Sequence, residues 1–512
     1  MRVGVAAIHG AEASMQDDGP WSLPFGWCWT TMDKVSPLNP STSFDGLDPA
    51  SEIPFIPMVA VAEETGQIDT SARRRVQDVA KGYVRFMEGD VIFAKITPCM
   101  ENGKVAPVVG LPNRYAAGST EFHVFRPVAV DQRYLWYWLV DRGFRGRAKR
   151  NMSGSAGQLR VPADWLREAK FPLAPLAEQR RIVARVDELF AEIAEGEAAL
   201  AAARKDLDTF RRALLKAAVT GELTRDWRAA NPTSETGRDV LADIKKEGAN
   251  SASVSGRTRR ALVKEQLDTS ALHEIPNGWA WSTLGEIGEI VGGITVDKKR
   301  KPVDPVIVPY LRVANVQRGH VDLSEVKSIV VERASAEKLR LVAGDLLLNE
   351  GGDRDKIGRG WVWDGTIPNM IHQNHVFRVR LHSKAFDPFF ISHYANEMGR
   401  SFFIEKGKQT TNLASISLTK VSMLPVPVPP SAEAVEIIRR VADALTWWEE
   451  AIALLDAEAA DVARLKQSIL KAAFQGRLVP QDKADEPATT LLAGNGSNFA
   501  RTKRSRARKL AS

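Results

Sequence analysis

Residues 178–219 have the sequence EQRRIVARVDELFAEIAEGEAALAAARKDLDTFRRALLKAAV, which contains no proline and a single glycine, Gly196. Apolar residues recur along it at alternating steps of four and three, and only Gly196 interrupts the frame. This heptad spacing is typical of a coiled-coil helix, here about 60 Å long. Its apolar seam includes Ile182, Val186, Leu189, Leu207, Phe210 and Leu214.

A second stretch, offset by 255 residues, repeats this seam. Its apolar positions include Ile437, Val441, Leu455, Leu465 and Ile469, and only Glu458 breaks the frame. A long helix with one apolar stripe needs a partner for that stripe. Each helix could lie on its own domain, but a globular surface rarely offers so long and straight a groove. We therefore expect the two helices to pack on each other, antiparallel, because a whole domain separates them in the chain.

The duplication extends through the rest of the chain. LPFGWCW at 23–29 returns as IPNGWAW at 275–281, HVFR at 123–126 returns at 375–378, and LLKAA at 214–218 returns as ILKAA at 469–473. This period is too long for a solenoid repeat, whose units span a few tens of residues. It predicts a pair of similar domains related by a pseudo-twofold. Such a molecule can present two similar surfaces to double-helical DNA, which has twofold symmetry of its own.

Between these landmarks, short β-rich runs broken by Gly, Pro and Asn indicate α+β domains with curved or mixed sheets. In the first domain we expect strands over 55–61, 89–95 and 122–125 and a helix over 134–145. Residues 231–262 are rich in Gly, Ser and basic residues, which indicates a flexible linker. The predicted order is a lead-in over 1–20, the first domain over 21–175, a long helix over 176–222, a linker over 223–268, the second domain over 269–430, a second long helix over 431–479 and a basic tail over 480–512.

Composition narrows the class of protein. The 512 residues are 44% hydrophobic and 26% charged, as expected for globular domains, and no apolar run is long enough to span a membrane. The two cysteines, Cys28 and Cys99, are better explained as small core residues than as a disulfide, which fits a cytoplasmic protein. The net charge of +7 suggests a polyanionic partner. The basic run at 501–509 is either a solvated tail or a phosphate contact.

Catalytic signatures are missing from the sequence. It contains no Walker A motif, no GxGxxG between a strand and a helix, and no CxxC or HExxH spacing for a metal. His123 and His375 each lie in an apolar β run, where a packed or turn histidine is favoured over a catalytic base. We therefore predict no catalytic residue, no metal site and no cofactor bound by this chain.

Polar and basic side chains instead gather on loops at corresponding places in the two domains. Arg and Lys suit guanine, Gln and Asn suit adenine, and lysine also suits phosphates; the alternative is ordinary solvated loops. Candidate DNA contacts in the first domain are Lys95, Lys104, Ser155, Gln158 and Arg160. Those in the second are Lys298, Lys299, Arg300, Arg354, Lys356, Lys408, Gln409 and Asn412.

One segment carries a family resemblance. FPLAPLAEQRRIV at 171–183 resembles the P-L-x-E-Q-x-x-I-V signature that opens the conserved helix of type I restriction-modification specificity subunits. The openings at 23–29 and 275–281 are similar to the start of that family's target recognition domains. The resemblance covers residues 21 to about 480. The second copy keeps Glu433 but has Ala434 where Gln179 stands in the first.

The resemblance implies a non-catalytic DNA reader. Each target recognition domain would read one half of a bipartite site, with the coiled coil as spacer. The subunit would join two methyltransferase subunits, which bring S-adenosylmethionine, and restriction subunits, which bring ATP, Mg and the nuclease. Two rivals remain on the residues alone: a scaffold that joins two protein partners without touching DNA, and a self-contained DNA-modifying enzyme.

Overall fold

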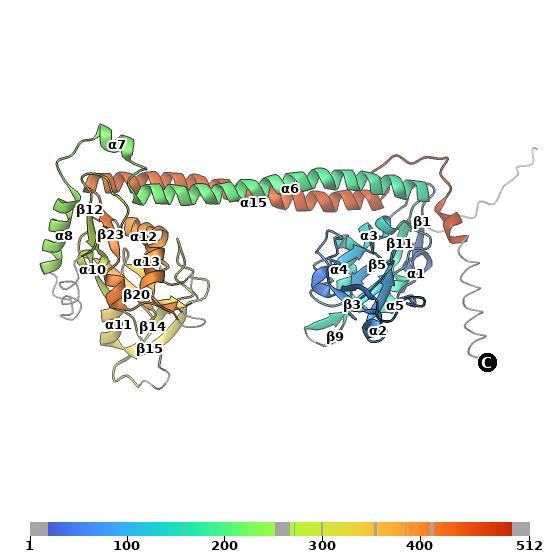
Figure 1. Cartoon of the computed structure of the whole chain (residues 1–512), viewed down its shortest axis with the longest axis horizontal. Coiled ribbons are helices and arrows are strands. Elements are labelled where there is room, and N and C mark those ends of the chain that lie inside the picture. Colours follow the sequence, from blue (N-terminus) through green and yellow to red (C-terminus); the bar gives the residue numbers. More distant parts are fainter. Residues whose placement is uncertain are drawn as a thin grey trace, which may run out of the picture. The chain divides into compact units, whose positions relative to one another are not determined.

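The computed structural model describes residues 19–493 except 156, 251–266, 271, 298, 300, 353–355, 385 and 410–413 (Figure 1). The chain divides into two compact units, residues 1–200 with 457–512 and residues 201–456. Each unit contains one α+β domain and the adjoining portions of both long helices. This division cuts across the predicted boundaries because each domain packs on the helix portions beside it. No helix within the described ranges combines the length and the apolar character that crossing a membrane requires.

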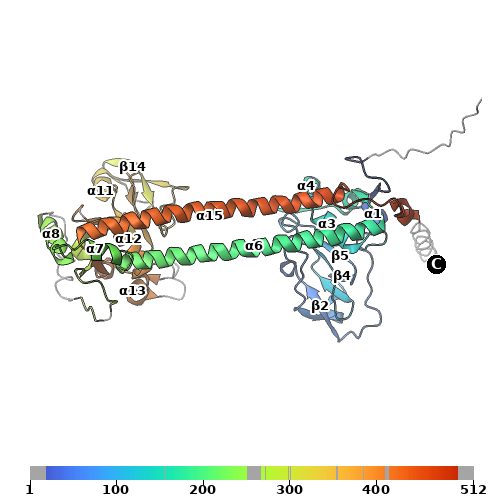
Figure 2. The same ribbon diagram turned by 90° about the horizontal axis from the view of Figure 1, so that it is seen from above.

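The two long helices are α6 (Leu176–Val219) and α15 (Ser431–Phe474), which run side by side within each unit (Figures 1 and 2). In the second unit, Trp448 Nε1 donates to the carbonyl oxygen of Leu207 at 3.0 Å. In the first unit, Lys466 Nζ donates to Glu197 at 2.7 Å. Early residues of one helix thus meet late residues of the other, which confirms the predicted antiparallel pairing.

Most residues of the predicted seam are buried or half-buried, and two are exposed. Ile182, Val186, Leu214, Ile437, Val441 and Ile469 are buried, and Leu189, Leu207 and Leu455 are half-buried. Leu465 is 50% exposed, and Phe210, at the equivalent position of the first helix, is 41% exposed but stacks on Trp447. Each long helix packs on a domain as well as on the other helix. Its buried stripe is therefore turned toward the domain and includes residues outside the heptad frame, such as Leu470 and Ala473.

The first domain combines small sheets with short helices. Its elements are β1 (Cys28–Thr31), α1 (Met32–Val35), β2 (Glu52–Ile56), η1 (Met58–Ala60), β3 (Arg73–Arg75), α2 (Val76–Val79), β4 (Val84–Met87), β5 (Val91–Ala94), β6 (Val105–Pro107), β7 (Tyr115–Gly118), β8 (Phe122–Phe125), α3 (Gln132–Val140), α4 (Arg142–Arg150), β9 (Ser153–Ser155), β10 (Gln158–Arg160), α5 (Ala163–Glu168) and β11 (Lys170–Leu173). The strand orders are β3-β2-β7-β4, β6-β5-β8, β1-β11 and β9-β10.

Two of these elements differ from their sequence expectations. The strand expected over 55–61 ends at Ile56, because Pro57 lacks an N–H for the ladder and a 3-10 turn follows. The helix expected over 134–145 is two helices, α3 and α4, that break at Asp141. The Asp141 side chain accepts from the backbone N–H of Phe144 and so caps α4.

The second domain repeats this architecture. Its elements are α7 (Arg225–Ala230), α8 (Gly237–Asn250), β12 (Ala280–Thr283), α10 (Leu284–Ile287), β13 (Gly288–Gly292), β14 (Pro305–Leu311), β15 (Lys327–Glu332), α11 (Arg333–Leu339), β16 (Leu346–Asn349), β17 (Gly351–Gly352), β18 (Gly360–Val362), β19 (Ile371–His372), β20 (Val376–Leu381), α12 (Pro388–Glu397), α13 (Gly399–Lys406), β21 (Lys408–Gln409), β22 (Ala414–Ser415), α14 (Leu418–Ser422) and β23 (Pro425–Val428). Much of the expected flexible linker is therefore helical, in α8; residues 251–266 lie outside the described part.

Strand register shows which residues of the two domains are equivalent. In both domains a buried aspartate, Asp90 or Asp345, precedes the central strand. Each pairs with an arginine, Arg126 at 2.7 Å and Arg380 at 2.7 Å. The HVFR repeat in the sequence matches Arg126 with Arg378 instead. The structural equivalence of the two strands therefore differs from the sequence match by two residues. A shift of two keeps every side chain on its original face, which is why the sequence match survives it.

Candidate functional site

Four of the predicted contacts in the first domain lie on neighbouring segments. Ile96 forms an isolated antiparallel bridge with Arg160, and the Val161 N–H donates to the carbonyl of Lys95 at 2.9 Å. Arg160 ends the β9–β10 hairpin, which places Ser155 opposite Gln158, and both of these residues are exposed. The fold thus brings Lys95, from the end of β5, beside a hairpin about sixty residues away in the chain.

The two cations of this group have different surroundings. Arg160 donates through Nε and Nη2 to both oxygens of Glu121, at 2.9 and 2.8 Å. This hydrogen bonding lowers the pKa of Glu121, and the Lys95 ammonium lowers it further. Lys95 Nζ donates to the carbonyl oxygen of Thr120 at 2.7 Å, which leaves its charge without a carboxylate bonded to it. Arg160 is therefore better suited to holding the hairpin, and Lys95 to receiving an anion.

Lys104 lies apart from this group. Its ammonium donates to the carbonyl oxygens of Met58 at 3.3 Å and Val61 at 2.8 Å, at the two ends of the η1 turn. These hydrogen bonds indicate that Lys104 stabilises the η1 turn. Its contact with DNA stays a prediction from the sequence.

In the second domain, the described candidates come from adjoining strands and one loop. β22 pairs with β17 on one side and with β21 on the other, so Gly351 and Gly352 share one small sheet with Lys408 and Gln409. A side chain built at Gly352 would meet the Lys356 stem at 3.2 Å. Lys299 is exposed, and its backbone N–H donates to Asp297 at 2.8 Å. The remaining candidates, Lys298, Arg300, Arg354 and Asn412, lie outside the described residues.

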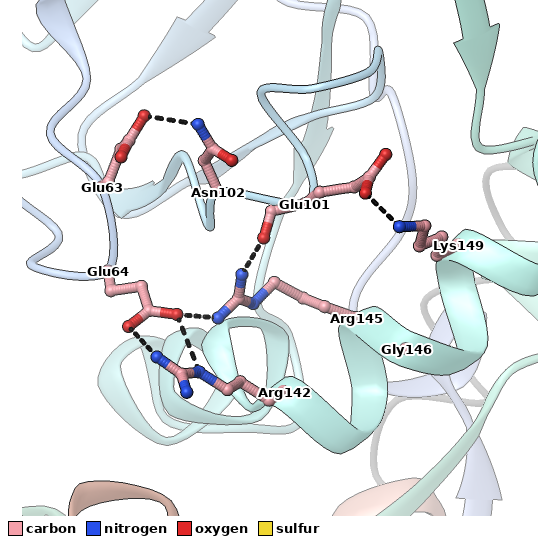
Figure 3. Close-up of a pocket in the computed structure, with 8 residues that line it drawn as sticks. All are labelled: Glu63, Glu64, Glu101, Asn102, Arg142, Arg145, Gly146 and Lys149. Atoms are coloured by element: carbon pink, nitrogen blue, oxygen red, sulfur yellow. Dashed lines mark hydrogen bonds and ion pairs between the residues drawn. The ribbon is translucent and has the colours of Figure 1, made fainter. Parts of the chain in front are cut away.

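A cavity of about 560 Å³ lies between α4 and two loops of the first domain, and most of its charged side chains are paired, while Glu63 accepts from the amide of Asn102 (Figure 3). Glu64 bonds to Arg142 at 3.3 Å and also to the buried Arg145. Across the cavity, Glu101 pairs with Lys149. Because each of these carboxylates has a cationic partner, the arrangement suits a clamp between α4 and the loops better than acid–base chemistry.

The two histidines of the HVFR repeat have different surroundings. His123 is buried, with Nδ1 at 3.0 Å from Asn39 Nδ2 and Nε2 at 3.0 Å from the carbonyl oxygen of Val161, and burial lowers its pKa. His375 is exposed at a turn and bonds to Glu350 at 2.6 Å. Both fit the expectation of a packed or turn histidine. Within the described residues, no three His, Cys, Asp or Glu side chains are grouped as metal ligands would be.

Sequence reasoning missed two residues near Lys95. Tyr83 lies just before β4 and Arg85 lies on it. Together with Lys95 they line a cavity of about 260 Å³. The local signal was weak, because Arg85 is a single cation in a β run. Only the meeting of β4 with the 39–42 segment and the end of β5 makes these residues a group.

Comparisons with known proteins agree on one family. Residues 44–201 match the family model of the type I restriction modification DNA specificity domain. The chain is 29% identical over 357 residues to the EcoAI type I restriction enzyme specificity subunit of Escherichia coli, which covers 61% of this chain and 59% of that protein. It is 23% identical over 500 residues to the EcoKI specificity subunit of E. coli K12, covering 96% of this chain and 97% of that one.

A solved structure also shares the fold. The structure comes from a study of complex assembly and conformational transition of the type I R-M system. It superposes with a TM-score of 0.61 at 20% sequence identity, and the match covers 90% of this chain and 100% of that one.

Proposed function

Because the chain belongs to the family of type I restriction-modification specificity subunits, we propose that it is the DNA-recognition subunit of such a complex. It reads a bipartite DNA site, one half with each α+β domain. The observation that carries this proposal is the duplicated domain, in which a similar scaffold carries different polar segments, the β9–β10 hairpin in one copy and the β17–β22–β21 strands in the other. A constant scaffold with unlike loops suits two unlike half-sites.

The proposal assigns the chemistry to other subunits. Two methyltransferase subunits bind this chain and supply S-adenosylmethionine, and restriction subunits supply ATP, Mg and the nuclease. The chain itself positions these subunits on DNA and works in the cytoplasm. Within the first domain, Lys95 contacts phosphate, whereas Gln158 at the hairpin reaches base edges, because an amide can bond an adenine edge bidentately.

The experiment separates a DNA reader from a scaffold that touches no DNA. The complex of this chain with its methyltransferase subunits is titrated with duplex DNA over a salt series. A reader that neutralises several phosphates loses affinity steeply as salt rises, with a log–log slope of about −0.9 per phosphate. A scaffold would leave only the weak binding of the methyltransferase subunits alone, which are measured in parallel. Equal binding with and without this chain would contradict the proposal.

A further inference from the structure

The cavity of about 260 Å³ in the first domain is lined from three directions. The 39–42 segment contributes Asn39, Ser41 and Thr42, the β4 region contributes Tyr83 and Arg85, and Lys95 follows β5. Of the described residues that line it, none is acidic, and two are cationic. Two cationic residues that line one small cavity repel each other, and an anion bound between them would relieve that repulsion. Hydroxyl and amide groups beside them supply further hydrogen bonds for such an anion.

Buried groups behind the cavity hold its wall in place. Asn39 Oδ1 accepts from the Val124 N–H at 2.9 Å, and Asn39 Nδ2 lies 3.0 Å from Nδ1 of the buried His123. The hydroxyl of Thr42 accepts from Arg126 Nη2 at 2.8 Å. Arg126 is itself paired with the fully buried Asp90, so its charge is compensated. The wall is therefore preorganised, and Arg85 and Lys95 supply the cations of the lining.

The rim beside the cavity is both basic and aromatic. Tyr83 Oη accepts from Arg74 Nη1 at 2.8 Å, and the Arg74 guanidinium lies 4.1 Å from the centre of the Phe55 ring. Arg74 is the middle residue of β3, an edge strand made of three exposed arginines. Cations interleaved with aromatic rings are typical of surfaces that bind nucleic acid.

The second domain does not repeat this charge pattern. Asp90 and Asp345 are equivalent, and each is followed by its central strand, so the position of Lys95 corresponds to Glu350. Glu350 bonds to His375 at 2.6 Å. A carboxylate at that position disfavours an anion. The shared scaffold therefore does not require a cation here, and Lys95 is a feature of the first domain alone.

We propose that this cavity binds one phosphate group of the DNA backbone, held jointly by Arg85 and Lys95. The inference rests on the proposed function and deepens it, because it names the contact that sets the first domain on the duplex. Phosphate contacts fix the register of a protein on DNA, and base contacts then read the sequence. The neighbouring β9–β10 hairpin, bridged to the residue after Lys95, is thereby brought to the same stretch of DNA.

The test measures salt dependence with a duplex of random sequence, since a phosphate contact is independent of sequence. The full chain assembled with methyltransferase subunits is compared with Arg85→Ala, Lys95→Ala and the double variant. For the double variant, the slope of log affinity against log salt concentration is expected to be shallower by about 0.9, because one phosphate contact is lost. Lys170→Ala, an exposed lysine of β11 outside the cavity, serves as the matched control and keeps the wild-type slope.

Three outcomes would overturn the inference, and a fourth would overturn the proposed function on which it rests. An unchanged slope in a double variant that melts like the wild type overturns the inference, as does a loss of about 1.8, which would mean two separate phosphates. Lys95→Arg keeps the charge, so it should retain the slope if the site is electrostatic; loss there also counts against the proposal. A wild-type complex that shows no salt-dependent DNA binding defeats the proposed function itself, which is a different failure.

Discussion

At the scale of single residues, the start of each long helix is anchored in the same way. Glu178 is buried and accepts from Trp27 Nε1 at 2.9 Å, and Glu433 is buried and accepts from Trp279 Nε1 at 2.9 Å. A second donor differs between the copies: Thr224 bonds Glu433 at 2.7 Å. Two motifs that recur separately in the sequence therefore form one contact in each unit, between a domain and its helix.

The Trp27–Glu178 hydrogen bond predicts a measurable coupling. Trp27→Phe keeps an aromatic ring but removes the indole donor, so a buried carboxylate loses a partner. We expect the free energy of unfolding to fall by about 1–3 kcal/mol. The measurement is a double-mutant cycle with Glu178→Ala, followed by denaturant unfolding. A coupling energy near zero would show that the tryptophan stabilises only by packing.

Two buried histidines of the second domain predict a pH dependence of stability. Burial lowers the pKa of His372 to about 4 and that of His393 to about 4, from an ordinary value of 6.5. Between these values the unfolded chain binds more protons than the folded one, so stability declines as pH falls from 6.5 toward 4. His372→Gln should flatten this decline between pH 7 and pH 5.5, measured by denaturant unfolding. His320→Gln, at an exposed position, should leave it unchanged.

At the scale of elements, the helix pair shows how a heptad frame and a domain surface compete. Val186 of α6 is fully buried, whereas Leu465 of α15 is 50% exposed although both belong to the predicted seam. Near the domain, α6 buries residues against the core that contains Phe171 as well as against α15. One apolar face of the helix therefore packs against both the domain and the other long helix. Some heptad positions remain exposed to solvent as a result.

This difference in burial predicts that aspartate destabilises the protein far more at position 186 than at position 465. Val186→Asp would bury an unpaired charge and should cost several kcal/mol, about 3 or more. Leu465→Asp places its charge in water and should change stability by about 0.5 kcal/mol or less. Thermal melting of the two variants, both in the first unit, compares them directly. Equal destabilisation would mean that Leu465 packs in the seam after all.

At the scale of the whole molecule, the segments that follow the two long helices return to equivalent places. A side chain at Gly221 would lie 2.4 Å from Pro276, and one at Gly476 would lie 2.2 Å from Pro24. Both glycines have positive φ, +76° and +64°, which suits the turn that ends a helix. Each domain opening, with its Pro-x-Gly-Trp motif, thus packs on the end of the other half's helix.

Because each unit repeats the same junctions, the domains should be exchangeable. Replacing residues 21–175 by the matching domain of a related specificity subunit should change one half of the methylated DNA site and preserve the other. The measurement is mapping of methylated bases in a host genome that carries the hybrid. The reciprocal exchange of residues 269–430 is the matched control and should change the opposite half. Changes in both halves, or in neither, would contradict independent reading.

Much of the architecture could be predicted from the chain alone. Heptad spacing predicted α6 and α15 because helical periodicity is a local property that survives whatever packs on the helix. The recurrence of Pro-x-Gly-Trp and of the Leu-Lys-Ala-Ala run predicted the duplicated domains, since a repeat is visible without any structure. Cation-bearing loops could be named, but not the contacts that they make.

The tertiary structure decided what depends on contacts between distant segments. Strand register made Arg380, and not Arg378, the counterpart of Arg126, because pairing with a buried aspartate outweighs a match in sequence letters. The domain surface decided which seam residues are buried. The approach of β4, β5 and the 39–42 segment brought Arg85 and Lys95 to one cavity. Such pairings come from packing between residues far apart in the chain, and a local pattern does not contain that information.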